Sequence, residues 1–330
     1  MIKVSVIIPN YNGEKYLRDC LESLRGQDYL EFEIIIIDNA SQDSRYEWLR
    51  EYKDIIFKPL NQNYGFSKAV NEGIKIAKGE YVLLLNNDTI VEKDFIRQLV
   101  VAIEKDEKIF GVSSKMIAYD DHSIMDDAGD EYSVVGWAYK LGDGKSVENY
   151  TKSYKVFSAC AGAALYRKSI FDKIGLFDEV FFAYLEDVDI SYRARIYGYY
   201  NVYCPDAKVY HIGSATSGGR YNSFKIKLSG RNNIYLAYKN MPVIQLIINL
   251  PCLGIGTLIK TWVFKKKGYE RDYRDGIVEG LKTIKRVNKV PFRIQHTMNY
   301  IHIELLLIKN TFKYLIMCIK KKITKDSHAS

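Results

Sequence analysis

The sequence lacks several features that would place it in common protein classes. Its 330 residues contain no internal repeat and no low-complexity linker. The apolar run at the N-terminus, "IKVSVIIP", is too short for a signal peptide. No Cys-x-x-Cys pair occurs, so neither a disulfide framework nor a thiolate zinc site is expected from the five scattered cysteines, Cys20, Cys160, Cys204, Cys252 and Cys318. These absences favour a reducing compartment, and we expect the N-terminal part of the chain to lie in the cytoplasm.

Two common nucleotide-binding signatures are also missing. The first expected strand is not followed by the G-x-G-x-x-G turn that holds a dinucleotide pyrophosphate, and the chain has no G-x-x-x-x-G-K-[ST] phosphate loop. A diphosphate would therefore not be held by a glycine-rich turn. A divalent cation is then its expected partner, and hard cations prefer carboxylate and amide oxygens as ligands.

The charge that is present is unevenly distributed. Residues 1–220 hold 27 Lys and Arg against 34 Asp and Glu, whereas residues 221–330 hold 21 against 6, so the net charges are −7 and +15. We therefore expect an N-terminal domain over 1–220 and a basic region over 221–330. A basic region favours anionic lipid or nucleic acid, but no nucleic-acid-binding motif accompanies it, so no nucleic acid partner is predicted.

Short apolar runs alternate with segments of helical periodicity from residue 3 to about residue 114. Strands are expected at "VSVIIP", "FEIIIID", "DIIFK", "YVLLLNN" and "IFGVSS", with helices over 14–25, 42–52, 65–78 and 93–104. Near-continuous Ile, Val and Leu strands between helices predict an α/β, Rossmann-like fold, in which helices flank a mostly parallel sheet. A pair of strands around "YNVYC" and "AKVYH" is expected to close this domain near residue 215.

Asn and Asp side chains follow the strands of the expected sheet. Asn10 and Asn12 follow the first strand, Asp38 follows the second, and residues 86–88, "NND", follow "YVLLL". Asn and Asp are common in turns, so the turns after the strands would by themselves explain Asn or Asp at some of these positions. Because ligands bind at the carboxyl ends of strands in such sheets, the complete set favours a polar ligand across this edge.

Six segments occur in a characteristic order along about residues 3–235. They are "SVIIPNYNGEKYL", "IIIIDNASQD", "NYGFSKAVNEGI", "LLLNNDTIV", "GLFDEVFFAYLEDVDISYRARIYGY" and "VYHIGSATS". Any one of these segments is a weak signal, whereas the ordered set is specific. By this set the chain resembles the family 2 inverting glycosyltransferases with the GT-A fold, and within them the rhamnosyltransferase-like branch.

The resemblance implies a site for a nucleoside diphosphate sugar and a metal ion. Asp88 corresponds to the last carboxylate of the family's DxD motif and would bind Mn²⁺ or Mg²⁺, with His211 completing the metal site. A lone histidine is more often an ordinary core or surface residue, and it is the resemblance that singles out His211. Asn86 replaces the first carboxylate of the motif, so weaker metal binding is expected and Asn86 is expected to contact sugar or ribose. The other implied donor-binding residues are Pro9, Tyr11, Asn12, Asp38, Asn63, Gly65 and Asn87.

Glu186 and Asp187 stand where the family has its catalytic Glu-Asp pair. They follow the apolar run "VFFAYL" and begin a short helix, whose dipole favours an ionised carboxylate. Asp187 is therefore predicted to be the general base, with N-capping of the helix as the alternative role. Asp189 and Arg193 lie four residues apart and are predicted to form a structural ion pair.

Two apolar stretches in the basic region are each followed by lysines. Residues 241–259 carry no charge and precede Lys260 and the lysines at 265–267, and residues 301–319 precede those at 320–322. The first stretch is near the lower length limit for a membrane span and is interrupted by Pro242, Pro251 and two glycines. It predicts a re-entrant or in-plane element with a basic collar at an anionic membrane, and the alternative is a buried helical hairpin.

Together these features predict a metal-dependent inverting glycosyltransferase at the cytoplasmic face of the membrane. We expect it to move a sugar, with rhamnose from dTDP-rhamnose as the first candidate, from a dTDP- or UDP-sugar to a lipid-linked or polysaccharide acceptor in cell-surface glycan synthesis. A nucleotidyltransferase would also place carboxylates and a metal at the edge of such a sheet. A non-catalytic membrane-bound carbohydrate-binding protein is the third possibility, because Asn86 weakens the metal motif.

Overall fold

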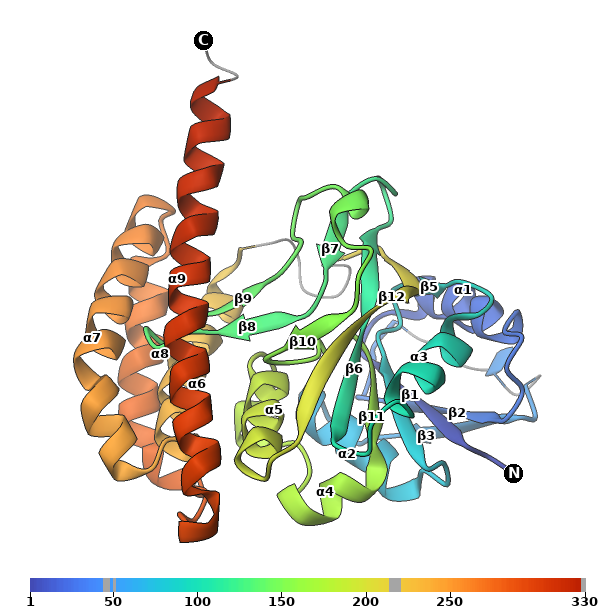
Figure 1. Ribbon diagram of the computed structural model, residues 1–330. Coiled ribbons are helices and arrows are strands. Elements are labelled where there is room, and N and C mark those ends of the chain that lie inside the picture. Colours follow the sequence, from blue (N-terminus) through green and yellow to red (C-terminus); the bar gives the residue numbers. More distant parts are fainter. Residues whose placement is uncertain (44–47, 50–51, 214–220, 328–330) are drawn as a thin grey trace.

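A mostly parallel sheet forms the centre of the N-terminal part of the chain (Figure 1). The computed structural model describes residues 1–43, 48–49, 52–213 and 221–327. The strands along the sheet run in the order β10 (Tyr154–Val156), β12 (Tyr200–His211), β6 (Ile109–Ala118), β11 (Ala163–Arg167), β4 (Tyr81–Leu85), β1 (Val4–Asn10), β2 (Phe32–Asp38) and β3 (Ile55–Pro59). Two short strands join it at the sides, β5 (Thr89–Val91) on β12 and β7 (Met125–Asp127) on β6.

The direction of the strands confirms the predicted α/β fold. β1 pairs in parallel with both β2 and β4, β2 pairs in parallel with β3, and β6 pairs in parallel with β12. β11 is antiparallel to β4 and β6, so it is reversed between strands that share one direction. The carboxyl ends of β1, β2 and β4 therefore meet at one edge of the sheet.

Two apolar cores cover the two faces of the sheet, because neighbouring side chains on a strand point to opposite faces. On β1, Val6 and Ile8 join one core, where α1 (Glu14–Arg25) and α3 (Phe95–Ile103) pack. Ile7 joins the other core, where the covering helices are α2 (Phe66–Ile76), α4 (Lys168–Ile174) and α5 (Glu186–Ile196). This arrangement explains why the strands read as continuous apolar runs.

The expected elements of the N-terminal part are largely confirmed. The helices predicted over 14–25, 65–78 and 93–104 are α1, α2 and α3, whereas the helix predicted over 42–52 lies partly outside the described residues. The expected strand pair near residue 205 is wrong. It is the single strand β12, which has an irregular register against β6 between Tyr203 and Lys208. The predicted boundary between residues 220 and 221 falls beside residues 214–220, which lie outside the described part.

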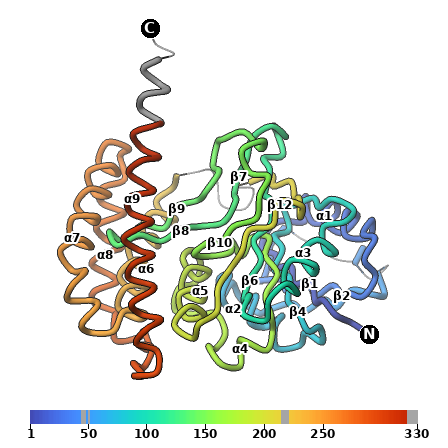
Figure 2. Tube along the Cα trace, viewed as in Figure 1, coloured from blue at the N-terminus to red at the C-terminus, as the bar shows by residue number. Residues whose placement is uncertain are grey.

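Four helices stand side by side beside the sheet (Figure 2). They are α6 (Ser223–Asn240), α7 (Val243–Lys266), α8 (Glu270–Thr283) and α9 (Thr297–Ser327). α7 continues through Pro251, so the expected interruption of this apolar stretch does not occur. Among the described residues, α7 is the one helix that is long and apolar enough to cross a membrane.

A β-hairpin connects the two parts of the molecule. It consists of β8 (Asp130–Tyr132) and β9 (Ala138–Lys140), and its turn lies against α7 and α9 (Figure 1). Trp137 Nε1 donates to Gly256 O of α7 over 3.1 Å, and Tyr139 Oη donates to Asn310 O of α9 over 2.7 Å. Only glycine fits at residue 256, because an added Cβ would lie 2.1 Å from Val135 O.

Candidate active site

Three buried side chains at the strand ends form a hydrogen-bonded chain. Asn87, just after β4, donates from Nδ2 to Oδ1 of Asn10 at the end of β1, over 2.6 Å. Asn10 donates from Nδ2 to Oδ1 of Asp38 at the end of β2, over 2.9 Å. The structure thus brings Asn87 and Asp38 together, as expected from the strand order. Asn10, which was not among the predicted donor-binding residues, joins them.

Asp38 also organises the turn that follows β2. Its carboxylate accepts hydrogen bonds from the backbone N–H of Ser41 over 3.1 Å and from Ser41 Oγ over 2.6 Å. Asn12, in a left-handed conformation with φ of 49°, donates its backbone N–H to the same Ser41 Oγ over 2.8 Å. Pro9 and Tyr11 lie half-buried beside this turn. Asp38 therefore has the turn role that Asn and Asp commonly take after a strand, and its part in donor binding stays a prediction.

A second set of amides lies at the start of α2. Asn39 is buried and donates from Nδ2 to Asn63 Oδ1 over 3.0 Å and to Gly65 O over 3.1 Å. Asn63 Oδ1 also accepts the backbone N–H of Gly65 over 2.9 Å. Gly65 has a φ of 85°, and an added Cβ would lie 2.4 Å from Phe182 O. Glycine at residue 65 therefore allows the segment before α5 to approach α2.

Asp88 and His211, the predicted metal ligands, lie next to each other. Pairing of β5 with β12 places His211 opposite Thr89, and His211 Nε2 lies 3.4 Å from Asp88 Oδ1. On its other side, His211 Nδ1 lies 2.7 Å from Oδ2 of Asp126, the middle residue of β7. Asp126 was not found from the sequence, because β7 has only three residues and no strand pattern marks it.

The two carboxylates determine how His211 titrates. Burial lowers the pKa of His211, but the neighbouring carboxylates of Asp126 and Asp88 outweigh this effect and raise the pKa to about 9. Burial raises the pKa of Asp126, but His211 and Lys140 lower it to about 2. In the absence of a bound cation, His211 therefore carries the positive charge between these carboxylates.

This group fits a divalent cation. The His211 Nε2 atom is buried and has no hydrogen-bond partner within the usual distance among the described residues, although the Asp88 carboxylate lies beside it. An imidazole nitrogen and a carboxylate oxygen side by side are suitable ligands for Mn²⁺.

Asn86 follows β4 directly, and its backbone N–H donates to Gly162 O over 2.8 Å.

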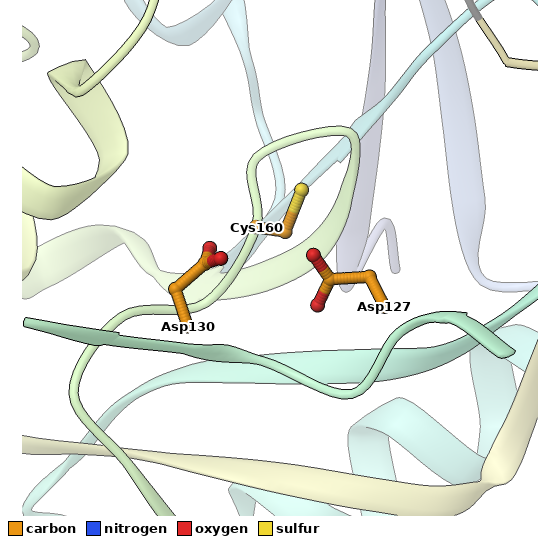
Figure 3. A group of neighbouring side chains, drawn as sticks. All are labelled: Asp127, Asp130 and Cys160. Atoms are coloured by element: carbon orange, nitrogen blue, oxygen red, sulfur yellow. The ribbon is translucent and has the colours of Figure 1, made fainter. Parts of the chain in front are cut away.

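A second acidic group includes Asp127, which follows Asp126 in the chain and contacts the same Lys140. Asp127, Asp130 and Cys160 have ligand atoms within 4.8 Å of one another, and Figure 3 shows Cys160 between the two carboxylates. Burial raises the pKa of Asp127 to about 6, against the opposing effect of Lys140, whose Nζ lies 3.6 Å from Asp127 Oδ2. Burial and the charge of Asp127 raise the pKa of Asp130 still further.

Glu186 and Asp187 begin α5, as the sequence predicted. Burial and the adjacent Asp187 raise the pKa of Glu186, whose Oε2 has no hydrogen-bond partner among the described residues. Asp187 is only half-buried. Its Oδ1 accepts the backbone N–H of Val188 over 2.8 Å, and the backbone of Ala161 also hydrogen-bonds its carboxylate. Ala161 is adjacent to Gly162, so one short loop connects Asp187 with the strand end that bears Asn86.

The segment before Glu186 has an unusual backbone. Phe182, Tyr184 and Leu185 have φ values of 65°, 69° and 68°, which are costly for residues other than glycine. Asn232 of α6, which is fully buried, donates from Nδ2 to the carbonyl oxygens of Phe181, Ala183 and Tyr184 over 3.0, 2.9 and 2.7 Å. α6 therefore holds the segment that leads into the Glu-Asp pair, a contact that sequence patterns did not reveal.

Asp189 and Arg193 form the predicted structural ion pair. Asp189 is fully buried, and Arg193 Nη2 lies 2.8 Å from its Oδ2. Lys239 Nζ of α6 also contacts this oxygen over 3.0 Å, and Asn240 Nδ2 donates to Oδ1 over 2.8 Å. Lys239 of α6 thus helps to neutralise the buried Asp189 carboxylate of α5. α6, which is the first helix of the basic region, is therefore part of the structure around the site.

Comparison of the sequence with known proteins identifies relatives of this chain. The profile of the family described as "Glycosyl transferase family 2" matches residues 5–175. Poly-beta-1,6-N-acetyl-D-glucosamine synthase of Staphylococcus epidermidis is 28% identical over 219 residues, which are 66% of this chain and 51% of that protein. The chain thus spans about half the length of the curated relatives that it matches.

Solved structures share the fold at low sequence identity. TarS 1-349 of S. aureus in complex with UDP-GlcNAc matches with a TM-score of 0.58 and 20% identity, covering 87% of this chain and 81% of that one. The mannosyltransferase PcManGT of Pyrobaculum calidifontis in complex with GDP-Man and Mn²⁺ matches with a TM-score of 0.55 and 14% identity, covering 96% and 83%. At these identities the likeness establishes the arrangement of the sheet and its helices, which is the expected GT-A fold.

Proposed function

The chain belongs to glycosyl transferase family 2, and we propose that it transfers a sugar from a nucleoside diphosphate donor to an acceptor hydroxyl with inversion at the anomeric carbon. The observation that carries this proposal is the position of Asp187. Its half-buried carboxylate lies at the N-terminus of α5, next to the loop that touches the strand end bearing Asn86.

In this proposal Asp187 accepts the proton of the attacking hydroxyl. Its burial raises its pKa, which makes it a stronger base than a carboxylate in water, while backbone N–H groups keep the ionised form available. Glu186 is more deeply buried and its pKa is raised further, so we assign it a supporting role in which it stays protonated. Asn10, Asp38, Asn87 and the turn at Ser41 supply polar groups for the nucleotide.

A divalent cation is part of the proposal. Asp88 and His211 would hold it, and a bound Mn²⁺ or Mg²⁺ would neutralise charge on the donor diphosphate. The Mn²⁺ in the PcManGT complex supports this assignment for the fold. Asp127, Asp130 and Cys160 form another group of possible ligands, but the resemblance to the family assigns the metal to Asp88 and His211.

The identity of the donor is the open part of the proposal. Rhamnose from dTDP-rhamnose is the prediction from the sequence motifs, whereas the matched proteins carry the names of N-acetylglucosamine and mannose compounds. A donor panel should therefore contain dTDP-rhamnose, UDP-N-acetylglucosamine and GDP-mannose. A lipid-linked or polysaccharide acceptor at the cytoplasmic membrane face completes the proposal.

A thermal-shift screen of this panel with and without Mn²⁺ tests the site. A donor that binds only the folded protein raises its melting temperature by mass action. We expect one donor to do so in a manner that depends on Mn²⁺, and Asp88→Ala to remove that dependence. Glu148→Ala, an exposed carboxylate on the surface, is the control and should behave like the wild type. Unchanged Mn²⁺-dependent binding in Asp88→Ala would place the metal elsewhere.

Attachment to an anionic membrane is the second part of the proposal, and the orientation of α7 supports it. The buried residues of this helix are Gln245, Asn249 and Gly256, and the amides of Gln245 and Asn249 donate to Glu304 Oε2 of α9. The outer side instead exposes apolar side chains at helical spacing, namely Ile244, Ile247, Ile248, Ile255, Leu258, Ile259 and Trp262. A helix with its polar side inward and its apolar side outward is suited to lipid rather than to water.

A further inference from the structure

A pocket lies where the β8–β9 hairpin meets α7 and α9. Aromatic rings and lysines dominate its lining, which includes Trp137, Tyr139, Tyr221, Lys260, Lys267 and Tyr314. None of these residues belongs to the strand-end site described above. The pocket is therefore a separate feature of the region where the helices contact the hairpin.

The rings form a continuous wall. The ring of Tyr314 on α9 lies 5.3 Å from that of Trp137 and 5.0 Å from that of Tyr139, measured between centroids. Trp137 is fixed by its hydrogen bond to Gly256 O, so this wall is attached to both α7 and α9. Rigid aromatic faces of this kind suit contact with sugars and hydrocarbon chains.

The two lysines bring unneutralised positive charge to this wall. Lys260 Nζ lies 5.9 Å from the ring centroid of Trp137, and Lys267 Nζ lies 3.6 Å from that of Tyr221. Neither lysine forms an ion pair with a carboxylate in the part of the chain that the structure describes, and the surrounding region has a net charge of +15. Two ammonium groups without counter-charges that line one pocket favour an anion such as a phosphate.

The pocket borders α7, and the β8–β9 hairpin that lines it also carries Lys140, which contacts Asp126. Lys260 is on the same helix as the exposed apolar residues Leu258 and Trp262. In the other direction, Trp137 is three residues from Lys140, whose Nζ lies 3.4 Å from Asp126. Three residues of extended chain span about 10 Å, so the hairpin connects the pocket with the site over a short distance.

We propose that this pocket binds the phosphate or diphosphate of a lipid-linked acceptor. The hydrocarbon chain of the acceptor then lies along the apolar side of α7, the phosphate contacts Lys260 and Lys267, and the attached sugar reaches along the hairpin toward Asp187. This inference rests on the proposed function and adds the place where the acceptor is held.

The test compares vesicle binding of the full-length protein and two double variants. Vesicles of phosphatidylcholine carry either a polyprenyl phosphate or the same charge as phosphatidylglycerol. The wild type should bind the polyprenyl phosphate vesicles at least about tenfold more tightly than the charge-matched ones, because both lysines contact the same terminal phosphate in the pocket. Lys260→Gln with Lys267→Gln should abolish this preference.

A matched control separates the pocket from general electrostatics. Lys265→Gln with Lys266→Gln removes the same charge from exposed positions of α7 outside the pocket. This variant should bind both kinds of vesicle more weakly but keep the preference. If the first double variant is not folded, Lys267→Gln alone, at an exposed position after the end of α7, should still reduce the preference severalfold.

Three outcomes would overturn the proposal. They are a wild type without preference, equal loss of preference in both double variants, and a preference that survives in Lys260→Gln with Lys267→Gln. Inorganic pyrophosphate tests the source of the anion, and a thermal shift by free pyrophosphate in a wild type without vesicle preference would make the pocket a site for a soluble anion. The donor thermal shift is measured on the same proteins. Its absence in the wild type would count against the proposed function, and the vesicle result would still decide the pocket.

Discussion

Single side chains at the strand-end edge are held by other side chains of the protein. A buried chain of hydrogen bonds connects Asn87, Asn10 and Asp38. The carboxylates of Asp126 and Asp88 lie on the two sides of the His211 ring. Sites built from side chains that are already fixed lose little entropy when a ligand binds. At the residue scale, the side chains of the proposed site are therefore held in place by the protein itself.

Asp127 gives a prediction for the dependence of stability on pH. Its pKa of about 6 in the folded protein lies above the ordinary value of 3.8, so the folded state binds more protons between these values than the unfolded state. Stability should therefore fall as the pH rises from about 4 to about 6, by up to about 3 kcal/mol from this group. Asp127→Asn should remove this part of the decline.

Denaturant unfolding of both proteins at pH 4 and pH 7 measures the effect. The free energy of unfolding should differ less between the two pH values in Asp127→Asn than in the wild type. Asp143→Asn, at an exposed position, provides the control and should decline like the wild type. An identical decline in Asp127→Asn would show that Asp127 is not the group that titrates.

At the scale of elements, α6 positions the start of α5. The amide of Asn232 holds three carbonyls of the segment in which Phe182, Tyr184 and Leu185 have positive φ, and this segment leads directly to Asp187. We expect Asn232→Ala to destabilise the protein by about 1–3 kcal/mol, because buried carbonyls lose their donors. Misplacement of Asp187 should also reduce the transfer rate by about 10-fold to 100-fold.

Steady-state kinetics distinguish positioning from general damage. In Asn232→Ala, kcat should fall while the donor-induced thermal shift is retained. Asn149→Ala, which removes an exposed amide, is the control and should leave both unchanged. Loss of donor binding in proportion to kcat would mean that Asn232 maintains the whole fold rather than the position of Asp187.

The elements that the sequence predicted share one property, which is local periodicity. β1, β2 and β4 were predictable because Ile, Val and Leu fill both faces of a covered strand, and α1 because its apolar residues recur at helical spacing. Asp88 was placed at the end of β4 by the same reasoning, and its proximity to His211 is confirmed.

The elements that were missed depend on contacts between distant parts of the chain. Asp126 lies 85 residues from His211, and Asn232 lies about 50 residues from the carbonyls that it holds. β5 has three residues and exists through its pairing with β12. Pro251 was expected to interrupt the apolar stretch, yet α7 continues through it, because one missing N–H does not outweigh the remaining backbone hydrogen bonds.

At the scale of the whole molecule, exposed apolar stripes on α7 and α9 are the surfaces that we propose to enter the membrane. On α9 the stripe consists of Ile301, Leu305, Ile308, Phe312, Leu315, Ile316 and Ile319. Deletion of the basic region is a poor test, because it would also remove Lys239 and Asn240 from the buried Asp189. Point substitutions on the stripes avoid this problem.

Ile248→Glu with Leu258→Glu should weaken binding to anionic vesicles by more than about tenfold. Each charge placed in an apolar environment costs about 2–3 kcal/mol even before the repulsion from anionic lipid is counted. Val101→Glu, at an exposed apolar position on α3 in the N-terminal part, is the matched control and should bind like the wild type. High salt should weaken only the electrostatic share of wild-type binding. Vesicle binding that is unaffected by the double substitution would contradict attachment through α7.

The anomeric configuration of the product shows whether the protein transfers sugar with inversion, as the role of Asp187 requires. The full-length protein is incubated with Mn²⁺, the donor found in the thermal-shift screen and a lipid-linked acceptor, and the product is analysed by NMR. We predict a glycosidic bond of inverted configuration, and a rate that falls by about 10²-fold or more in Asp187→Asn while donor binding persists. A product of retained configuration, release of pyrophosphate from a nucleoside triphosphate instead of sugar transfer, or near-normal turnover by Asp187→Asn would contradict the account.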